Sequence, residues 1–566
     1  MTERSAPTDH GDSSFQRAVA LFDGLATSGL EAVVVSPGSR STPLALAAAR
    51  CTSLTVHVIA DERSAAFFAL GLARASGHPP ALVATSGSAP AHWLPAAIEA
   101  SEDAQPLLLI SADRPAELLD CGANQATEQG RLFAAHARSV FALPADATPG
   151  HARDVGRRAA AACLWPRRGP VHINAAFREP LVAADLARYA AWSPSTAANM
   201  HLPGKVTPDL GVVAAAAARL GGRRGAILAG RLPPGDPAAR AVVSLARALD
   251  CAVIADPLSG LRAGHDPEAR ILCAADKFLR DEDAPTPDWL IRVGAPPVSR
   301  HVEQWAARCP ESLLLAATPA WSDPLRAART VLLGDPAASL SVLAAAVTRA
   351  GLRAAAWDAL DRCEAAALQS LAALPAPPAE AALVRAIAAA APADTPVFVA
   401  SSLVVRDFDS FLPLRAAPLA LYANRGVSGI DGNLSTAAGM VAAAHRPGIA
   451  VLGDLALFHD LNALSLCRDR PLVLVVINNG GGAIFGQLPQ AELPEFEALW
   501  LTPPALDLGQ AAALFGLAHV QLDATSALEE AIAEALASGR ASLLELVVDR
   551  AASHAGRMAW WHSPAR

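Results

Sequence analysis

A carboxylate and an amide follow two consecutive apolar runs in the C-terminal part of the chain. Asp454 comes directly after the run 449–453, and Asn479, followed by glycines, comes after the run 471–477. Consecutive parallel strands joined by one right-handed crossover end at the same sheet edge, so these side chains should lie close together. Their oxygens, with a backbone carbonyl freed by the glycines, suit Mg²⁺, which completes its octahedron with phosphate oxygens and water. An aspartate helix cap followed by a glycine-rich turn is the alternative interpretation.

Polar residues also follow the apolar runs of the N-terminal third. The triplet 61–63 (Asp-Glu-Arg) comes directly after the run 55–60, where it is either a solvated first helical turn or a carboxylate facing a ligand nitrogen. The loops 36–40 and 85–88 are small and rich in hydroxyl groups, so they could bring backbone N–H groups and helix N-termini to an anion. Ordinary turn and N-cap chemistry explains the same two loops equally well.

Four arginines lie at the ends of apolar runs in otherwise uncharged surroundings. They are Arg40, Arg114, Arg406 and Arg425. A guanidinium group binds a carboxylate through two parallel hydrogen bonds, so the set predicts substrates that carry several carboxylates. Each arginine taken singly is also consistent with a surface charge.

The elements that must position these residues follow one rhythm, repeated in three blocks. Short β-rich runs alternate with helical stretches, the pattern of buried parallel sheets, and 566 residues at 52% apolar composition leave room for several cores. We therefore expect an α/β fold of three doubly wound domains with mainly parallel sheets, over residues 1–190, 191–370 and 371–566. The Pro-rich stretches 190–210 and 374–379 are expected to be linkers. The expected strands are 32–36, 55–60, 81–85, 107–111, 225–229, 252–256, 289–293, 312–316, 330–334, 397–400, 419–422, 449–453, 471–477 and 543–548, and the expected helices include 351–373 and 457–468.

Composition excludes several classes of function. A net charge of −8 gives no electrostatic footprint for nucleic acid or an anionic membrane, and the eight cysteines include no C-x-x-C pair for zinc or redox chemistry. Lys205 and Lys277 are the only lysines, and neither has a recognisable setting for Schiff-base chemistry. No G-x-G-x-x-G follows the first strand of a block, which argues against a nicotinamide dehydrogenase. The N-terminus shows no signal-peptide pattern and no apolar run is long enough for a membrane span, so we expect a cytoplasmic protein without membrane insertion.

Several longer motifs make the constellation more specific. They are SPGSRSTPL (36–44), DERSAAFFALGLA (61–73), ATSGSA (84–89), SADRPAELLDCGANQ (111–125), SSLVVRD (401–407), NRGVSGIDGNLSTAAG (424–439), GDLALFHDLNAL (453–464) and NNGGGAIF (478–485). In this order they resemble the pyruvate-decarboxylase-like thiamin-diphosphate enzymes, which have a pyrimidine-binding, a central and a diphosphate/Mg-binding domain. More narrowly, they resemble the 2-succinyl-5-enolpyruvyl-6-hydroxy-3-cyclohexene-1-carboxylate (SEPHCHC) synthases of menaquinone biosynthesis.

The resemblance implies a role for each matching residue. Glu62 would hydrogen-bond the aminopyrimidine of thiamin diphosphate, and Ile430 would hold the cofactor in its bent shape. Leu455 stands where the wider superfamily commonly has glycine, which supports the narrower family, and Ser299-Arg300 stands where some members have a Lys-Arg pair. The full set implied is catalytic Glu62, Arg40 and Arg406; metal-binding Asp454, Asn479 and Gly481; cofactor-binding Glu62, Thr85, Ser86, Gly87, Ile430, Asp454, Leu455 and Asn479; and substrate-binding Ser39, Arg40, Arg114, Asn124, Gln125, Arg300, Ser402, Arg406, Arg425, Ile484 and Phe485.

The resemblance also implies a reaction and an assembly. The reaction is decarboxylation of 2-oxoglutarate followed by conjugate addition of the resulting carbanion to isochorismate, with thiamin diphosphate and Mg²⁺ (or Mn²⁺) as cofactors. The assembly is a homodimer or homotetramer with active sites between subunits. Two alternatives stay open. An acetolactate-synthase-like carboligase would leave the arginines without a purpose, and a non-catalytic homologue would have no need of Glu62, Asp454 and Asn479.

Overall fold

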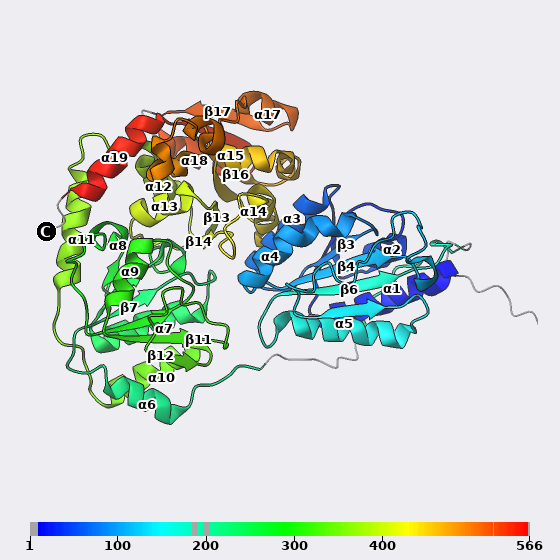
Figure 1. Cartoon of the computed structure of the whole chain (residues 1–566), viewed down its shortest axis with the longest axis horizontal. Coiled ribbons are helices and arrows are strands. Elements are labelled where there is room, and N and C mark those ends of the chain that lie inside the picture. Colours follow the sequence, from blue (N-terminus) through cyan, green and yellow to red (C-terminus); the bar gives the residue numbers. More distant parts are fainter. Residues whose placement is uncertain (1–9, 184, 186–188, 196–203, 524–525, 564–566) are drawn as a thin grey trace, which may run out of the picture. The chain divides into compact units, whose positions relative to one another are not determined.

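The computed structural model describes residues 10–183, 185, 189–195, 204–523 and 526–563, and its chain divides into two compact units (Figure 1). The first unit comprises residues 1–204 and 424–445, and the second comprises 205–423 and 446–566. Three six-stranded sheets run through them, the first in the first unit and the other two in the second, and every strand pairing between named strands is parallel. The predicted α/β class with doubly wound parallel sheets is therefore confirmed, while the boundaries of the three predicted domains stay predictions.

The first sheet forms from short apolar strands that are buried on both faces where they lie centrally. Its strands are β1 (Ala32–Val35), β2 (Thr55–Val58), β3 (Ala81–Ala84), β4 (Leu107–Asp113), β5 (Val140–Leu143) and β6 (Pro170–Ala176). Its helices are α1 (His10–Ala26), α2 (Thr42–Arg50), α3 (Glu62–Ser76), α4 (Leu94–Glu102) and α5 (Pro149–Leu164), with short 3₁₀ turns η1 (Ala89–Trp93) and η2 (Ala116–Leu118). The strand order is β2-β1-β3-β4-β6-β5. Helices α1 and α5 cover one face and α3 and α4 the other (Figure 1), which leaves the strand ends free to carry loops.

The first unit also contains α14 (Asn433–Ala444), although strands of the third sheet precede and follow this helix in sequence. Helix α14 packs closely on α3. A Cβ added at Gly71 would lie 2.0 Å from the Thr436 carbonyl oxygen, and one added at Gly439 would lie 2.0 Å from the Phe68 carbonyl oxygen. The two glycines therefore allow the backbones of the two helices to touch.

The second sheet has the strand order of a classical dinucleotide-binding fold. Its strands are β7 (Gly225–Ala229), β8 (Ala252–Ala255), β9 (Ile271–Leu272), β10 (Trp289–Val293), β11 (Glu311–Ala316) and β12 (Thr330–Leu333). Its helices are α6 (Leu210–Ala218), α7 (Pro237–Leu249), α8 (Ala275–Phe278), α9 (Arg300–Arg308), α10 (Pro336–Arg349) and α11 (Ala359–Ala372), with a turn η4 (Pro257–Ser259). In the order β9-β8-β7-β10-β11-β12, the chain adds β8 and β9 on one side of β7 and then β10, β11 and β12 on the other side. Ligands are therefore expected beyond the carboxyl ends of β7 and β10, where the order switches.

The third sheet repeats the strand order of the first. Its strands are β13 (Thr395–Val399), β14 (Leu419–Tyr422), β15 (Gly448–Gly453), β16 (Leu472–Asn478), β17 (Ala518–Leu522) and β18 (Ser542–Val547). Its helices are α12 (Ala379–Ala390), α13 (Leu403–Phe411), α15 (Asp454–His459), α16 (Leu464–Cys467), α17 (Leu508–Leu514), α18 (Leu528–Ala537) and α19 (Arg550–His562), with the turns η5 (Leu461–Ala463), η6 (Ala483–Gln487), η7 (Pro489–Glu492) and η8 (Glu497–Leu501). The order β14-β13-β15-β16-β18-β17 matches the first sheet strand for strand.

Several local expectations need correction. Strands β5, β6, β9 and β17 were not among the expected strands; β5 and β17 are edge strands with several exposed positions, so their apolar pattern is weak. The expected helix 351–373 begins only at Ala359, and the expected helix 457–468 is broken into α15, η5 and α16. Residues 196–203 of the expected linker lie outside the described residues. Among the helices that are described, none combines the length and the hydropathy needed to cross a bilayer.

Candidate active site

The loops after β1 and β3 meet at the carboxyl edge of the first sheet. The backbone N–H of Arg40 donates to Thr85 Oγ1 at 3.3 Å. Arg114, which follows β4, donates to the Ser86 hydroxyl. The predicted anion-binding loops and two of the predicted arginines therefore come from three neighbouring strands to one place.

The guanidinium groups of Arg40 and Arg114 at this edge are both buried, and they have different partners. Arg40 donates to the Phe177 carbonyl at 3.0 Å and to Glu179 Oε1 at 2.8 Å, and the Glu179 side chain is 70% exposed. Burial, and then the nearby charge of Arg40, lower the pKa of Arg114. Two cations held this close favour an anionic ligand, and an exposed carboxylate such as Glu179 is a group that a ligand carboxylate can replace.

The predicted amide residues lie on the loop that follows Arg114. Gln125 has φ +53° and lies against Gly87, with its Cβ 3.3 Å from the point that a Cβ on Gly87 would occupy. The Gly87 N–H donates to Gln129 Oε1 at 2.7 Å, and Gln129 is buried. Asn124, like Ser39 on the loop after β1, is exposed to solvent. Gln129 was not predicted, because a buried amide inside a loop has no distinct sequence pattern.

Glu62 lies in the first turn of α3, after β2. Asp61 is the N-cap of this helix and accepts the Ser64 N–H at 2.8 Å, so the capping task falls to Asp61 and not to Glu62. Glu62 is half-buried. The solvated-turn interpretation thus fits Asp61, while the Glu62 carboxylate is left for another purpose.

Arg425 and Ile430 lie on the segment that leads into α14. The backbone N–H groups of Gly426 and Val427 each donate to a Glu99 carboxylate oxygen at 2.7 Å, which attaches this segment to α4. Glu99 in turn pairs with Arg74 at 2.8 Å in a buried position. Ile430 remains 42% exposed on this anchored segment, an apolar side chain available for contact with a ligand.

Asp454, Asn479 and Gly481 meet at the carboxyl edge of the third sheet. The Gly481 N–H donates to Asp454 Oδ2 at 2.7 Å, and Gly481 has φ +116°, with a hypothetical Cβ only 2.1 Å from the Leu501 carbonyl oxygen. Only glycine fits this turn. Strands β15 and β16 are parallel neighbours with Gly453 opposite Ile477, so Asp454 and Asn479 follow adjacent strand ends, as expected, while their metal-binding role stays a prediction.

Two oxygens at this edge lack partners. Asp454 Oδ1 and Asn479 Oδ1 are both buried, and neither accepts a hydrogen bond from the described residues. Burial raises the pKa of Asp454, and the backbone N–H groups of Leu455 and Gly481 oppose that rise. A buried acceptor without a partner is costly, so a pair of them fits a hard cation. Within the described part of the chain, no group of three or more His, Cys, Asp or Glu side chains could hold a metal, so a cation here would also need backbone or ligand oxygens.

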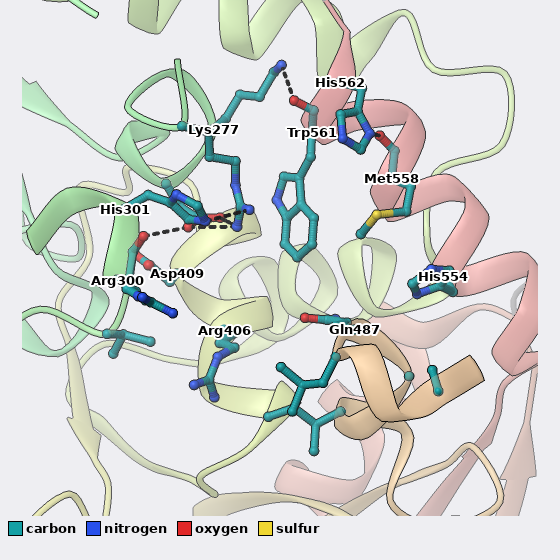
Figure 2. Close-up of a pocket in the computed structure, with 18 of the residues that line it drawn as sticks. Lys277, Arg300, His301, Arg406, Asp409, Gln487, His554, Met558, Trp561 and His562 are labelled. Carbon is teal, nitrogen blue, oxygen red and sulfur yellow. Dashed lines mark hydrogen bonds and ion pairs between the residues drawn. The ribbon is translucent and has the colours of Figure 1, made fainter. Parts of the chain in front are cut away.

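Three further predicted residues, Arg300, Arg406 and Ile484, line a pocket of about 1160 Å³ in the second unit (Figure 2). Arg300 opens α9 after the β10 strand end, Arg406 lies on α13, and Ile484 lies on η6. Arg406 Nη1 donates to the Ser402 carbonyl at 2.5 Å, and Ser402 has φ +72°, a conformation that is rare for serine and typical of functional sites. Phe485 follows Ile484 on η6 but is not part of the pocket lining.

The same pocket has walls that were not predicted. Lys277 lies on α8 and His301 on α9, two helices that accompany the second sheet. His554 and Trp561 lie on α19 (Figure 2). Lys277 Nζ donates to the Trp561 carbonyl at 2.9 Å, so it holds the end of α19. His301 was within reach of sequence reasoning because it adjoins Arg300, whereas nothing in the sequence links α8 with α19.

The predicted site residues thus form two groups. The group in the first unit comprises Ser39, Arg40, Glu62, Thr85, Ser86, Gly87, Arg114, Asn124, Gln125, Arg425 and Ile430. The group in the second unit comprises Arg300, Ser402, Arg406, Asp454, Leu455, Asn479, Gly481, Ile484 and Phe485. Each group lies on strand ends and adjoining segments of its own unit.

Comparison with known proteins places both groups in one family. Residues 16–137 match the thiamine pyrophosphate enzyme N-terminal TPP binding domain, and residues 408–546 match the C-terminal TPP binding domain. The structure is similar to benzoylformate decarboxylase from Polynucleobacter necessarius (TM-score 0.71, 17% identity, 94% of this chain and 98% of that one). It is also similar to a putative thiamin diphosphate-dependent enzyme from Mycobacterium smegmatis (TM-score 0.69, 19% identity, 94% and 99%). At these identities the two structures support the fold alone.

Sequence relatives are more specific. The chain is 40% identical to the 2-succinyl-5-enolpyruvyl-6-hydroxy-3-cyclohexene-1-carboxylate synthase of Dechloromonas aromatica, over 95% of this chain and 99% of the relative. It is 38% identical to the protein of the same name from Geobacillus kaustophilus, over 97% of each chain. Identity at this level along nearly the whole length means that the chain belongs to the SEPHCHC synthase family of thiamine pyrophosphate enzymes.

Proposed function

We propose that this protein is a thiamin-diphosphate-dependent enzyme that decarboxylates 2-oxoglutarate and adds the remaining carbon unit to isochorismate, giving SEPHCHC and CO₂ in menaquinone biosynthesis. The relatives' name describes a product with succinyl, enolpyruvyl and carboxylate groups, and therefore one rich in carboxylates. Arginines at the ends of strands in both units suit such substrates. The observation that carries the proposal furthest is the pair of buried oxygens without partners, Asp454 Oδ1 and Asn479 Oδ1, inside a chain whose two ends match TPP binding domains.

The third sheet would hold the diphosphate end of the cofactor. Asp454, Asn479 and the Gly481 carbonyl would bind Mg²⁺ or Mn²⁺, and Leu455 would lie beside them. The Gly481 N–H fixes the Asp454 carboxylate and leaves its second oxygen for the cation. When bound, thiamin diphosphate supplies the electron sink for loss of CO₂.

The first unit would hold the pyrimidine end. The Glu62 carboxyl group would hydrogen-bond a ring nitrogen and move a proton to and from it, since Asp61 leaves it free of capping. The loop carrying Thr85, Ser86 and Gly87 would contact the cofactor, and the exposed Ile430 would support it.

Positive and polar side chains would bind the substrate carboxylates. In the first unit these are Ser39, Arg40, Arg114, Asn124, Gln125 and Arg425; in the second unit they are Arg300, Ser402 and Arg406. Ile484 and Phe485 would form an apolar wall that excludes water from the reacting carbon. The arginines act by binding and orienting charge, with no covalent step required of them.

The assembly and location complete the proposal. Because the two groups of site residues lie in two units, a homodimer or homotetramer with sites shared between subunits suits the family pattern. A cytoplasmic location suits a chain with no membrane-spanning helix among its described residues.

Product formation in a defined mixture tests the proposal. Purified protein is incubated with Mg²⁺, thiamin diphosphate and 2-oxoglutarate, with or without isochorismate, and CO₂ and the condensed product are measured. We expect the condensed product only when all four components are present. CO₂ release that is independent of isochorismate, with no condensed product, would instead identify another 2-oxoacid decarboxylase.

A further inference from the structure

One wall of the pocket in the second unit is built around a buried carboxylate that has no role in the proposed function. Asp276 lies on α8 of the second sheet and is 5% exposed. It is part of the pocket lining, together with Arg300 and Arg406. A buried charge needs partners, so its contacts show what it holds in place.

Asp276 uses both of its oxygens. The Ser299 hydroxyl donates to Oδ1 at 2.7 Å, and the Ser410 hydroxyl donates to Oδ2 at 3.1 Å. Arg280 Nη2 lies 3.1 Å from each oxygen. Burial by itself would raise the pKa of Asp276, but the Arg280 charge and the Ser299 hydroxyl outweigh it and lower the pKa below its usual value. The carboxylate is therefore ionised at neutral pH and saturated with donors.

The two serines connect Asp276 with the two arginines of the pocket. Ser299 is the N-cap of α9 and stands directly before Arg300. Ser410 lies one turn after Arg406 on α13. One carboxylate thus joins the start of α9, in the second sheet, to the helix of the third sheet that carries Arg406.

The contacts of Arg280 add a second link to α9 and extend this network to one more wall, α19. Its Nη1 lies 3.0 Å from His301 Nε2, and its guanidinium carbon lies 3.6 Å from the centre of the Trp561 ring. Figure 2 shows His301 and Trp561 as parts of the same pocket. The walls formed by α9, α13 and α19 are therefore held through one charged pair.

We propose that Asp276 is a positioning residue that fixes Arg300 and Arg406 in one arrangement for the carboxylates of the substrate. The inference rests on the proposed function and gives the second sheet a part in it. Arginines that bind a carboxylate through paired hydrogen bonds bind it much more weakly when their guanidinium groups are displaced. A carboxylate that fixes both arginine-bearing helices therefore raises the affinity for the substrate without contacting it.

The test compares two buried aspartates in full-length protein with thiamin diphosphate and Mg²⁺ present. Asp276→Asn removes the charge, and Asp323→Asn is the matched control. Asp323 is also buried and pairs with Arg292 at 2.7 Å, but it is not part of the pocket lining. We expect Asp276→Asn to raise KM for at least one substrate about tenfold, with kcat changed less than about threefold and the Kd of thiamin diphosphate unchanged within about twofold. The control should leave all of these within about twofold.

A coupling measurement separates positioning from general damage. In an Arg300→Ala/Arg406→Ala background, adding Asp276→Asn should change kcat/KM less than about twofold, because the residues it positions are gone. The same tenfold loss in that background, or a rise in the Kd of thiamin diphosphate that matches the rise in KM, overturns the proposal.

Two smaller changes cover the case in which Asp276→Asn does not fold. Ser299→Ala and Ser410→Ala each remove one hydrogen bond, and each should raise KM about threefold. Unchanged KM in both variants overturns the proposal. If the wild-type protein makes no product, the proposed function fails, and calorimetric titration with 2-oxoglutarate decides the role of Asp276 alone: binding about tenfold weaker in Asp276→Asn supports it, and equal or absent binding overturns it.

Discussion

The first and third sheets have the same strand order but offer ligands opposite chemistry. In both sheets, the second strand in sequence lies on one side of the first strand and the third strand lies on its other side. Polar loops follow the first and third strands. At the first sheet the loops gather arginines whose heads are already bound, Arg40 to Glu179 and Arg114 to Ser86. At the third sheet the loops after β15 and β16 gather acceptor oxygens, and two of these have no partner among the described residues.

The difference teaches that strand order selects the place of a site and the edge residues select its ligand. At the first edge, protein groups already hydrogen-bond the two arginines, so a ligand must replace these groups in order to bind. The third edge carries Asp454 Oδ1 and Asn479 Oδ1, which accept no hydrogen bond from the described residues and so suit a ligand. We therefore expect substitutions at the third edge to affect ligand binding more than the stability of the ligand-free protein.

Asp454→Ala tests the third edge and should have the largest effect. Product formation should fall on the order of 1000-fold, because a cation loses a charged ligand. The free energy of unfolding of the ligand-free protein should fall by less than about 2 kcal/mol, because removal of a desolvated carboxylate offsets the lost hydrogen bond from the Gly481 N–H. A product assay and urea unfolding measure these two effects, and calorimetric titration with thiamin diphosphate and Mg²⁺ shows whether the loss arises in cofactor binding. A ligand-free protein destabilised by more than about 2 kcal/mol would mean that Asp454 is structural.

Glu62→Gln tests the first unit. We expect kcat to fall about 100-fold, because the amide cannot exchange a proton as the carboxyl group does. The melting temperature should not change, since Asp61 caps the helix. Asp61→Ala is the matched control and should cost about 1 kcal/mol of stability with little change in kcat. Retained turnover in Glu62→Gln would refute the assigned role.

Arg406→Ala separates substrate binding from cofactor binding at the third edge. Loss of a charged hydrogen bond to a carboxylate should lower kcat/KM about 30-fold, while the Kd of thiamin diphosphate stays within about twofold. Arg270→Ala, which removes an arginine paired with Asp361 outside the pocket, is the control. Equal loss of substrate and cofactor binding would count against a carboxylate site.

The smallest expected effect concerns a buried histidine beneath the first edge. His172 Nε2 lies 2.8 Å from the Ser111 hydroxyl, Nδ1 has no partner, and burial lowers the pKa of His172 to about 4. The unfolded chain therefore binds this proton more readily than the folded one between pH 6.5 and 4, and stability should fall as pH drops through that range. The slope from this group approaches about 1.4 kcal/mol per pH unit. Urea unfolding at several pH values should show a shallower slope in His172→Gln, and an identical slope would contradict the assignment.

Local patterns predicted most of the buried strands, although the largely buried strand β6 was missed. The runs that became β7 and β10 were expected at the same residues, because a fully buried parallel strand is a continuous apolar run between turns. The edge strands β5 and β17 were missed because partly exposed strands lack that run. The grouping of residues 424–445 with the first unit had no local sign either, since it depends on the close crossing of α3 and α14.

The sequence by itself determined the parallel α/β class and the placing of Asp454 and Asn479 at one edge, because strand ends joined by a single crossover meet wherever the rest of the chain lies. Only the tertiary structure decided that Asp276, Trp561 and Arg406 share one pocket. Each of these residues lies on a helix whose own sequence gives no indication of the other two helices. Their meeting depends on how the second sheet packs against α13 and α19, and contacts between elements distant in sequence leave no periodic trace in either of them.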